Sequence, residues 1–222
     1  MKYLMVGILG FSLMAAACED PAANKTKATV TNSASNSAAN AGNAVSVASV
    51  PAAKGEALVI NSENSKVEFT GSKVTGKHEG GFKNLSGTID FVNNKPEEST
   101  VTVDIDTASV YADDDKLTGH LKSADFFDVQ KFPKATFKST RIEADSAKGA
   151  NSYTVTGDFD LHGVTKSISF PATIKAGPDA VDVDAEFSVN RKDFGIVYAG
   201  TADDLIRDDV VIRLNLKAPK KK

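Results

Sequence analysis

The stretch Val181-Asp182-Val183-Asp184-Ala185-Glu186-Phe187-Ser188-Val189 decides the fold, because apolar and polar side chains alternate along its whole length. The same alternation recurs in VTVDID at residues 101–106, in YTVTGDFDL at residues 153–161 and in VVIRLNL at residues 210–216. Successive side chains of a β-strand point to opposite faces, so this pattern indicates strands that are buried on one face only. The sequence therefore predicts a sheet with one apolar face and one face in water.

Weaker forms of the pattern bring the expected number of strands to about eight, at residues 65–72, 81–92, 135–143 and 167–175. We find no segment that predicts a helix long enough to cover a sheet. The outer faces of the strands carry aspartates and a glutamate, which need water. The apolar faces must therefore cover each other, either in a sandwich of two sheets or in one sheet closed into a barrel. The alternation alone leaves both architectures open.

One short helix is expected between residues 112 and 126. Asp113, Asp114 and Asp115 suit its beginning, because carboxylates there accept hydrogen bonds from free backbone N–H groups and interact favourably with the helix dipole. A calcium loop is the alternative for three successive aspartates, but the residues that follow lack EF-hand spacing. The predicted fold class is all-β with one short helix.

The first 18 residues resemble a bacterial lipoprotein signal. Lys2 precedes an uncharged, mostly apolar run at residues 4–17, and three alanines lead to Cys18, the single cysteine of the chain. The run is shorter than the ~20 residues that a membrane-spanning helix needs, and it is typical of a signal-peptide core. We expect residues 1–18 to direct export and Cys18 to carry a lipid anchor, facing the periplasm or the cell surface. The alternative is an ordinary signal peptide cut near Ala17, which leaves a soluble periplasmic protein.

Three further regions follow the signal in the 222-residue chain. Residues 19–55 are rich in Ala, Asn, Ser and Thr, so we expect a disordered tether between anchor and domain. The barrel domain is expected over residues 56–219, and a basic tail over residues 220–222. The formal net charge of −3 argues against a nucleic-acid partner, which requires a clustered basic surface. A homodimer is left open.

The segment HLKSADFFDVQKFPKATFKST at residues 120–140 resembles the signature of the YceI-like family. Further matches are GGF at residues 80–82, GDFDLHGVTK at 157–166, NRKDFG at 190–195 and DVVIRL at 209–214. The resemblance implies an extended, lipocalin-like antiparallel barrel that holds a long isoprenoid-type chain, such as a polyprenyl lipid or a quinone, in its interior. It implies an exported binding protein, with no catalytic residue, no metal and no cofactor other than that lipid ligand.

Apolar side chains on the inner face of such a barrel are the candidate ligand-binding residues. They are Phe69, Phe82, Ile89, Val103, Ile105, Phe126, Phe127, Phe132, Phe137, Val155, Phe159, Phe170, Phe187, Phe194, Ile212 and Leu214.

The polar residues leave two alternative functions open. Three histidines can form a zinc site, so a metal-dependent hydrolase using His78, His120 and His162 is one alternative. They lie in separate segments without the short spacing of metal-ligand pairs, and we prefer structural roles for them. The other alternative is an interaction lipoprotein with a filled barrel. Arg191 is expected to pair with a carboxylate such as Asp125, or else to contact the head group of a ligand.

Overall fold

The computed structural model describes residues 19–33 and 55–221, and it confirms an all-β chain with one short α-helix. Its main sheet has twelve strands. These are β1 (Thr29–Asn32), β2 (Glu56–Asn61), β3 (Lys66–Lys73), β4 (Gly76–Phe82), β5 (Leu85–Phe91), β6 (Thr100–Asp106), β7 (Val110–Ala112), β8 (Lys134–Ala144), β9 (Ser152–Leu161), β10 (Val164–Ala176), β11 (Ala180–Asn190) and β14 (Asp209–Pro219).

The remaining elements are short. A separate hairpin consists of β12 (Gly200–Thr201) and β13 (Asp204–Leu205). The α-helix is α2 (Asp115–Leu121), and the 3-10 helices are η1 (Pro96–Glu98), η2 (Thr107–Ser109), η3 (Ser146–Lys148) and η4 (Arg191–Phe194).

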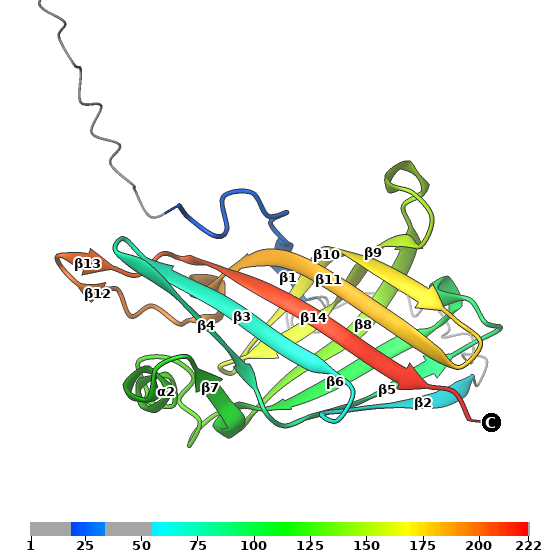
Figure 1. Ribbon diagram of the computed structural model, residues 1–222, viewed down its shortest axis with the longest axis horizontal. Coiled ribbons are helices and arrows are strands. Elements are labelled where there is room, and N and C mark those ends of the chain that lie inside the picture. Colours follow the sequence, from blue (N-terminus) through cyan, green and yellow to red (C-terminus); the bar gives the residue numbers. More distant parts are fainter. Residues whose placement is uncertain (1–18, 34–54, 222) are drawn as a thin grey trace, which may run out of the picture.

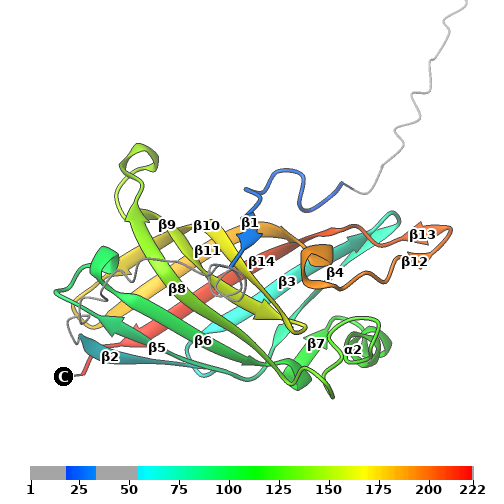
Figure 2. The same ribbon diagram turned by 180° about the vertical axis from the view of Figure 1, so that it is seen from behind.

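The main sheet is antiparallel and curls around a common interior (Figures 1 and 2). Its path runs β2-β5-β6-β8-β9-β10-β11-β14-β3-β4-β7, so β2 and β7 are the outer strands, and β14 also approaches β2. The arrangement is a half-barrel in which the apolar strand faces turn toward one another. The polar faces remain outside, where Arg213 on β14 donates to Glu186 on β11 at 2.8 Å.

The sheet has more strands than the eight that the alternation predicts. The segment at residues 81–92 is divided between β4 and β5, because the chain turns at Lys83 and Asn84. The three-residue β7 and the four-residue β1 are too short to show a period. Backbone pairing with neighbouring strands, which sequence periodicity does not report, creates both of these elements.

The helix is shorter than the expected span of residues 112–126. Asp114 caps it as predicted, since its carboxylate accepts a hydrogen bond from the Leu117 N–H at 2.7 Å. Turns replace the helix after Leu121, where the Phe126 N–H donates to the Ser123 carbonyl at 3.1 Å.

Residues 19–33 differ from the expected disordered tether, because β1 and the residues before it are hydrogen-bonded to strands of the main sheet. We call these residues the strap. The β10–β11 ladder covers only Thr173–Ala176 of β10, and β1 pairs instead with Lys166–Ser169 of that strand. On its other side, the Ala28 N–H donates to the Ser188 carbonyl of β11 at 2.8 Å. The strap therefore fills a gap between β10 and β11.

The rest of the predicted N-terminal organisation lies outside the described residues. This holds for the signal at residues 1–18, for Cys18, and for residues 34–54 of the expected tether. Within residues 19–33 and 55–221, no helix has the length and apolar character needed to cross a membrane.

Candidate functional site

The curled sheet contains an apolar cavity of about 210 Å³. For comparison, an apolar cavity of roughly 150 Å³ is large enough to take up benzene. Fourteen of the sixteen predicted lumen residues line it: Phe69, Phe82, Val103, Ile105, Phe126, Phe127, Phe137, Val155, Phe159, Phe170, Phe187, Phe194, Ile212 and Leu214. Phe126 and Phe127 follow α2, and Phe194 belongs to η4. The other eleven come from strands throughout the sheet, which shows that the alternating faces do converge on one interior.

The two other predicted residues do not line the cavity. Ile89 is 2% exposed and belongs to the main core cluster, where it packs among neighbouring side chains. Phe132 follows a turn at Asp128 and lies beside His162, with the two ring centroids 4.7 Å apart. Its position at the β9–β10 turn removes it from the inner face.

Several lining residues were absent from the prediction. Val67, Ile168, Ile174, Val183 and Leu216 occupy inward positions of strands, and a stricter use of the alternation would have found them. Ile196 and Ile206 belong to the irregular segment between η4 and β14, for which the sequence gives no periodic signal.

Aromatic rings form two groups along the cavity. Phe170 and Phe187 are stacked with centroids 4.3 Å apart, and Phe137 approaches Phe170 at 5.6 Å. Nearer to α2, Phe82 and Phe127 meet edge to face at 5.5 Å. Phenylalanine has no polar atom to satisfy, so both groups present surfaces suited to hydrocarbon.

The α2 end of the interior has its own core cluster. Val110, Leu121, Phe126 and Ile196 are buried there. Phe126 and Phe127 are adjacent in sequence, yet both line the cavity because the chain turns after α2. The ring of His120 lies against Phe126 at 4.9 Å, and its Nε2 is 2.8 Å from the Asp125 carboxylate.

Gly71 leaves open space in the cavity wall. It lines the cavity, and a Cβ atom built on it would meet no heavy atom within 4 Å. At Gly157, by contrast, a Cβ atom would lie 2.5 Å from Cζ of Phe137, so this glycine makes room for the ring. The interior thus contains one position at which a larger side chain would occupy free volume without a clash.

Arg191 is the charged residue among those that line the cavity, and it is 6% exposed. Its Nη1 donates to the Ile196 carbonyl at 2.7 Å, and its Nε donates to the Arg207 carbonyl at 3.1 Å. Its carboxylate partner is Asp208, at 3.4 Å, and not the expected Asp125. Burial lowers the pKa of Arg191, and the Asp208 carboxylate opposes that effect. The guanidinium therefore holds the segment between η4 and β14 in place.

The histidines have separate partners. His78 Nδ1 is 2.8 Å from the Asp113 carboxylate. His162 occupies the β9–β10 turn with a φ of 55°, a left-handed conformation typical of two-residue hairpin turns. Within residues 19–33 and 55–221, no three His, Cys, Asp or Glu side chains form a group that could hold a metal ion. In the described part of the chain, His78, His120 and His162 therefore do not come together as the zinc site that the hydrolase alternative requires.

Comparison with known proteins agrees with this architecture. The model of the YceI-like domain family matches residues 58–218. A UPF0312 protein of Pseudomonas putida (strain W619) is 36% identical over 139 residues, which cover 60% of this chain and 71% of the relative.

Solved structures show the same fold. The crystal structure of Burkholderia cenocepacia BcnA has a TM-score of 0.64 at 26% identity, covering 72% of this chain and 99% of that one. A structure described as a polyisoprenoid binding domain from Saccharophagus degradans has a TM-score of 0.59 at 19% identity, covering 75% of this chain and 100% of that domain. The match of the family model across most of the chain shows that the protein belongs to the YceI-like domain family.

Proposed function

We propose that this protein is an exported lipid-binding protein that holds a long isoprenoid-type chain, such as a polyprenyl lipid or a quinone, inside a lipocalin-like barrel fold. The observation that carries the proposal is the cavity, whose lining side chains are apolar except for Arg191. Because backbone carbonyls and Asp208 already bind that guanidinium, a hydrocarbon chain would meet little unsatisfied polarity. The description of the Saccharophagus degradans domain as polyisoprenoid-binding supports this choice of ligand.

Burial of hydrocarbon supplies enough free energy for such binding. Each methylene removed from water contributes ~0.8 kcal/mol, so ten of them contribute roughly 8 kcal/mol. Association and ordering subtract several kcal/mol, which leaves micromolar or tighter affinity for a longer chain. The proposed ligand therefore needs no polar anchor in the cavity.

We also propose that Cys18 carries the membrane anchor. One acyl chain binds a bilayer only marginally, so durable attachment takes the several chains of a bacterial lipoprotein. The protein would then act at the membrane that holds its ligand.

The function can be tested by identifying bound lipid. The protein is purified from bacteria that express the full chain, and its organic extract is analysed by mass spectrometry. A polyprenol of defined length is then titrated into the delipidated protein. We expect co-purified isoprenoid and saturable binding.

Two glycine variants make this test specific. Gly71→Leu fills the open space in the cavity and should abolish polyprenol binding while the circular dichroism spectrum stays unchanged. Gly119→Leu is the matched control, because Gly119 is exposed on α2 and also has open space around its Cβ position. Absence of lipid from the extract, together with absence of binding, would favour a filled-barrel interaction protein and overturn the proposal.

A further inference from the structure

We infer that one end of the molecule is a docking surface for a lipid bilayer, an inference that rests on the anchor proposed at Cys18. This surface, which we call the tip, comprises the β3–β4 turn at residues 73–76 and the segment at residues 197–206 that contains the β12–β13 hairpin. Both parts project from the same end of the sheet as α2 (Figures 1 and 2).

Exposed apolar side chains concentrate on the tip. Four large apolar side chains are strongly exposed among the described residues, and three of them, Val74, Val197 and Leu205, belong to the tip. They are 55%, 64% and 49% exposed. The fourth, Val59, is on β2 at the opposite end (Figure 1). Single exposed apolar residues are ordinary, but three on one projecting surface indicate an interaction site.

Hydrogen bonds join the two parts of the tip. The Val74 N–H donates to the Leu205 carbonyl at 3.2 Å, and the Thr75 hydroxyl donates to the Asp204 carboxylate at 2.9 Å. Lys73 forms an ion pair with Asp204, which balances the charge of the carboxylate next to Leu205. Val74 and Leu205 are therefore held next to each other on a paired backbone.

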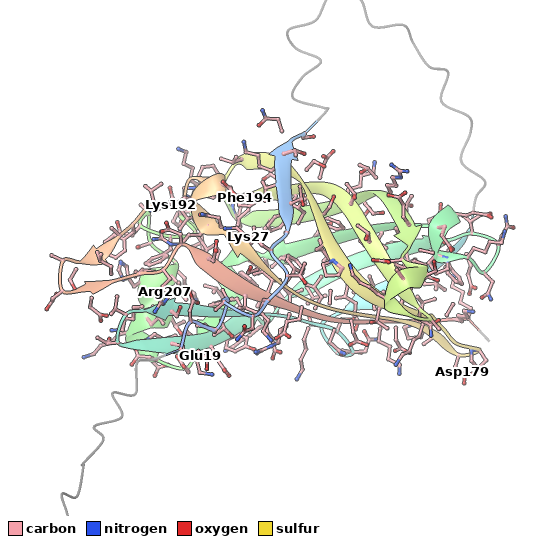
Figure 3. All side chains as sticks on the ribbon, turned by 90° about the horizontal axis from the view of Figure 1, so that it is seen from above. Glu19, Lys27, Asp179, Lys192, Phe194 and Arg207 are labelled. Carbon is pink, nitrogen blue, oxygen red and sulfur yellow. The ribbon has the colours of Figure 1, made fainter. Side chains whose placement is uncertain are left out.

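The described part of the strap begins at the base of the tip. Arg207 Nη1 is 3.4 Å from the Asp20 carboxylate, and the Arg207 N–H donates to the Ser72 carbonyl at 2.9 Å. Figure 3 shows Glu19 near Arg207 and far from Asp179, which lies at the other end. Consecutive Cα atoms are about 3.8 Å apart, so an acyl anchor on Cys18 would enter the bilayer beside the tip.

Because the strap begins next to the tip, we infer that the tip binds a bilayer. An anchor beside the tip keeps Val74, Val197 and Leu205 at the membrane, where apolar side chains gain free energy on leaving water. The cavity lining also reaches this end, since Phe69 and Ile206 line the cavity and belong to the elements that carry the tip. Docking there would place the interior next to the source of its proposed lipid.

Single tryptophans can test the orientation, because the chain contains no Trp. Val74→Trp and Leu205→Trp report on the tip, and Val59→Trp is the control at the opposite end with 56% exposure. The acylated protein is reconstituted into vesicles of phosphatidylethanolamine and phosphatidylglycerol with brominated acyl chains. We expect the fluorescence of Trp at positions 74 and 205 to be quenched, and that of Trp at position 59 to be unchanged. Equal quenching at all three positions would overturn the docking surface.

A second preparation separates this inference from the anchor proposal. The processed chain beginning at Cys18 is made without acylation, and its single thiol is coupled to a maleimide-bearing phospholipid in the same vesicles. If mass spectrometry shows no acyl group on the bacterial protein, the anchor proposal fails, and the coupled protein alone decides the docking surface. If both proteins attach to vesicles without selective quenching, the anchor stands and the docking surface is wrong.

Two strap variants test whether the strap sets the orientation. Ala28→Asp introduces a charge at a residue that is 5% exposed in the main core cluster, so it should release the strap. Ala23→Asp introduces the same charge at an exposed strap position and should leave the strap bound. Selective quenching should disappear only in Ala28→Asp. If quenching stays selective in Ala28→Asp although the strap of this variant has become protease-sensitive, the strap does not orient the protein.

Discussion

Arg191 shows how one charged residue can line an apolar cavity while its donors are bound by the protein itself. Its donors face the carbonyls of Ile196, Ile206 and Arg207. These carbonyls belong to the irregular segment that closes the α2 end of the interior, where no regular ladder can satisfy them. A buried arginine replaces the missing backbone partners, and its charge is matched by Asp208.

Replacement of Arg191 by Met should therefore destabilise the fold. The carbonyls and Asp208 would lose their donors, at an expected cost of about 2–4 kcal/mol in the free energy of unfolding, measured by urea denaturation. Lys192→Met is the control, because Lys192 binds the same Asp208 carboxylate from an exposed position and should cost less than about 0.5 kcal/mol. Equal effects of the two variants would contradict the structural role of Arg191.

Most of the candidate site could be predicted at the residue scale because the period of a strand fixes the face of each side chain. Val103 and Val155 line the cavity for this reason. The same reasoning was wrong in placing Phe132 in the cavity lining, because the direction of its side chain depends on the turn at Asp128, where φ is 45°. Ile206 was missed because its place depends on the Arg191 guanidinium, to which its carbonyl is bound.

At the scale of elements, the strap is the part that could not be predicted from the sequence. Its composition is typical of a disordered segment, and its one strand has four residues. The strap is ordered by hydrogen bonds to backbone groups that β10 and β11 do not pair with each other. Ion pairs add to this, such as that of Lys27 with Asp209 at 2.7 Å. Unpaired strand edges attract an added strand, and this chain supplies that strand from its own N-terminal region.

Acid should loosen the strap through Glu186. Hydrogen bonds from Lys25 and then from Arg213 lower the pKa of Glu186 in the folded protein. A carboxyl group with a lowered folded pKa stabilises at pH values above its unfolded pKa of about 4.3, and this contribution is lost as the pH falls through the lower folded value. Limited proteolysis with an acid-active protease should show a constant strap between pH 7 and 5 and a more accessible one below about pH 4.

Glu186→Gln provides the control for this pH dependence. Glutamine cannot ionise, so the variant should have a weaker strap at pH 7 and a smaller change on acidification. The effect should be modest, because the Lys25–Glu186 pair is partly exposed to solvent. An unchanged acid response in Glu186→Gln would assign the pH dependence to other carboxylates.

At the scale of the whole molecule, the free energy of unfolding should depend on whether a ligand occupies the cavity. A ligand that binds only the folded state at 100 times its Kd adds about 2.7 kcal/mol to the free energy of unfolding. For a domain of this size, that corresponds to a Tm higher by roughly 5–10 °C. Delipidation should therefore lower the Tm of the purified protein, and added polyprenol should restore it in differential scanning calorimetry. In Gly71→Leu, with the cavity filled, the Tm should respond to neither treatment.

The position of β1 between β10 and β11 also determines the order in which the chain can assemble. Lys25 meets Glu186 across 161 residues of sequence, and Lys27 meets Asp209 across 182. Contacts of such separation close large loops and form late, whereas the β9–β10 hairpin beside the gap is local and forms early. The gap that β1 fills exists only after β10 and β11 are in place. We therefore expect the strap to join the fold after β10 and β11 and to detach before those two strands separate.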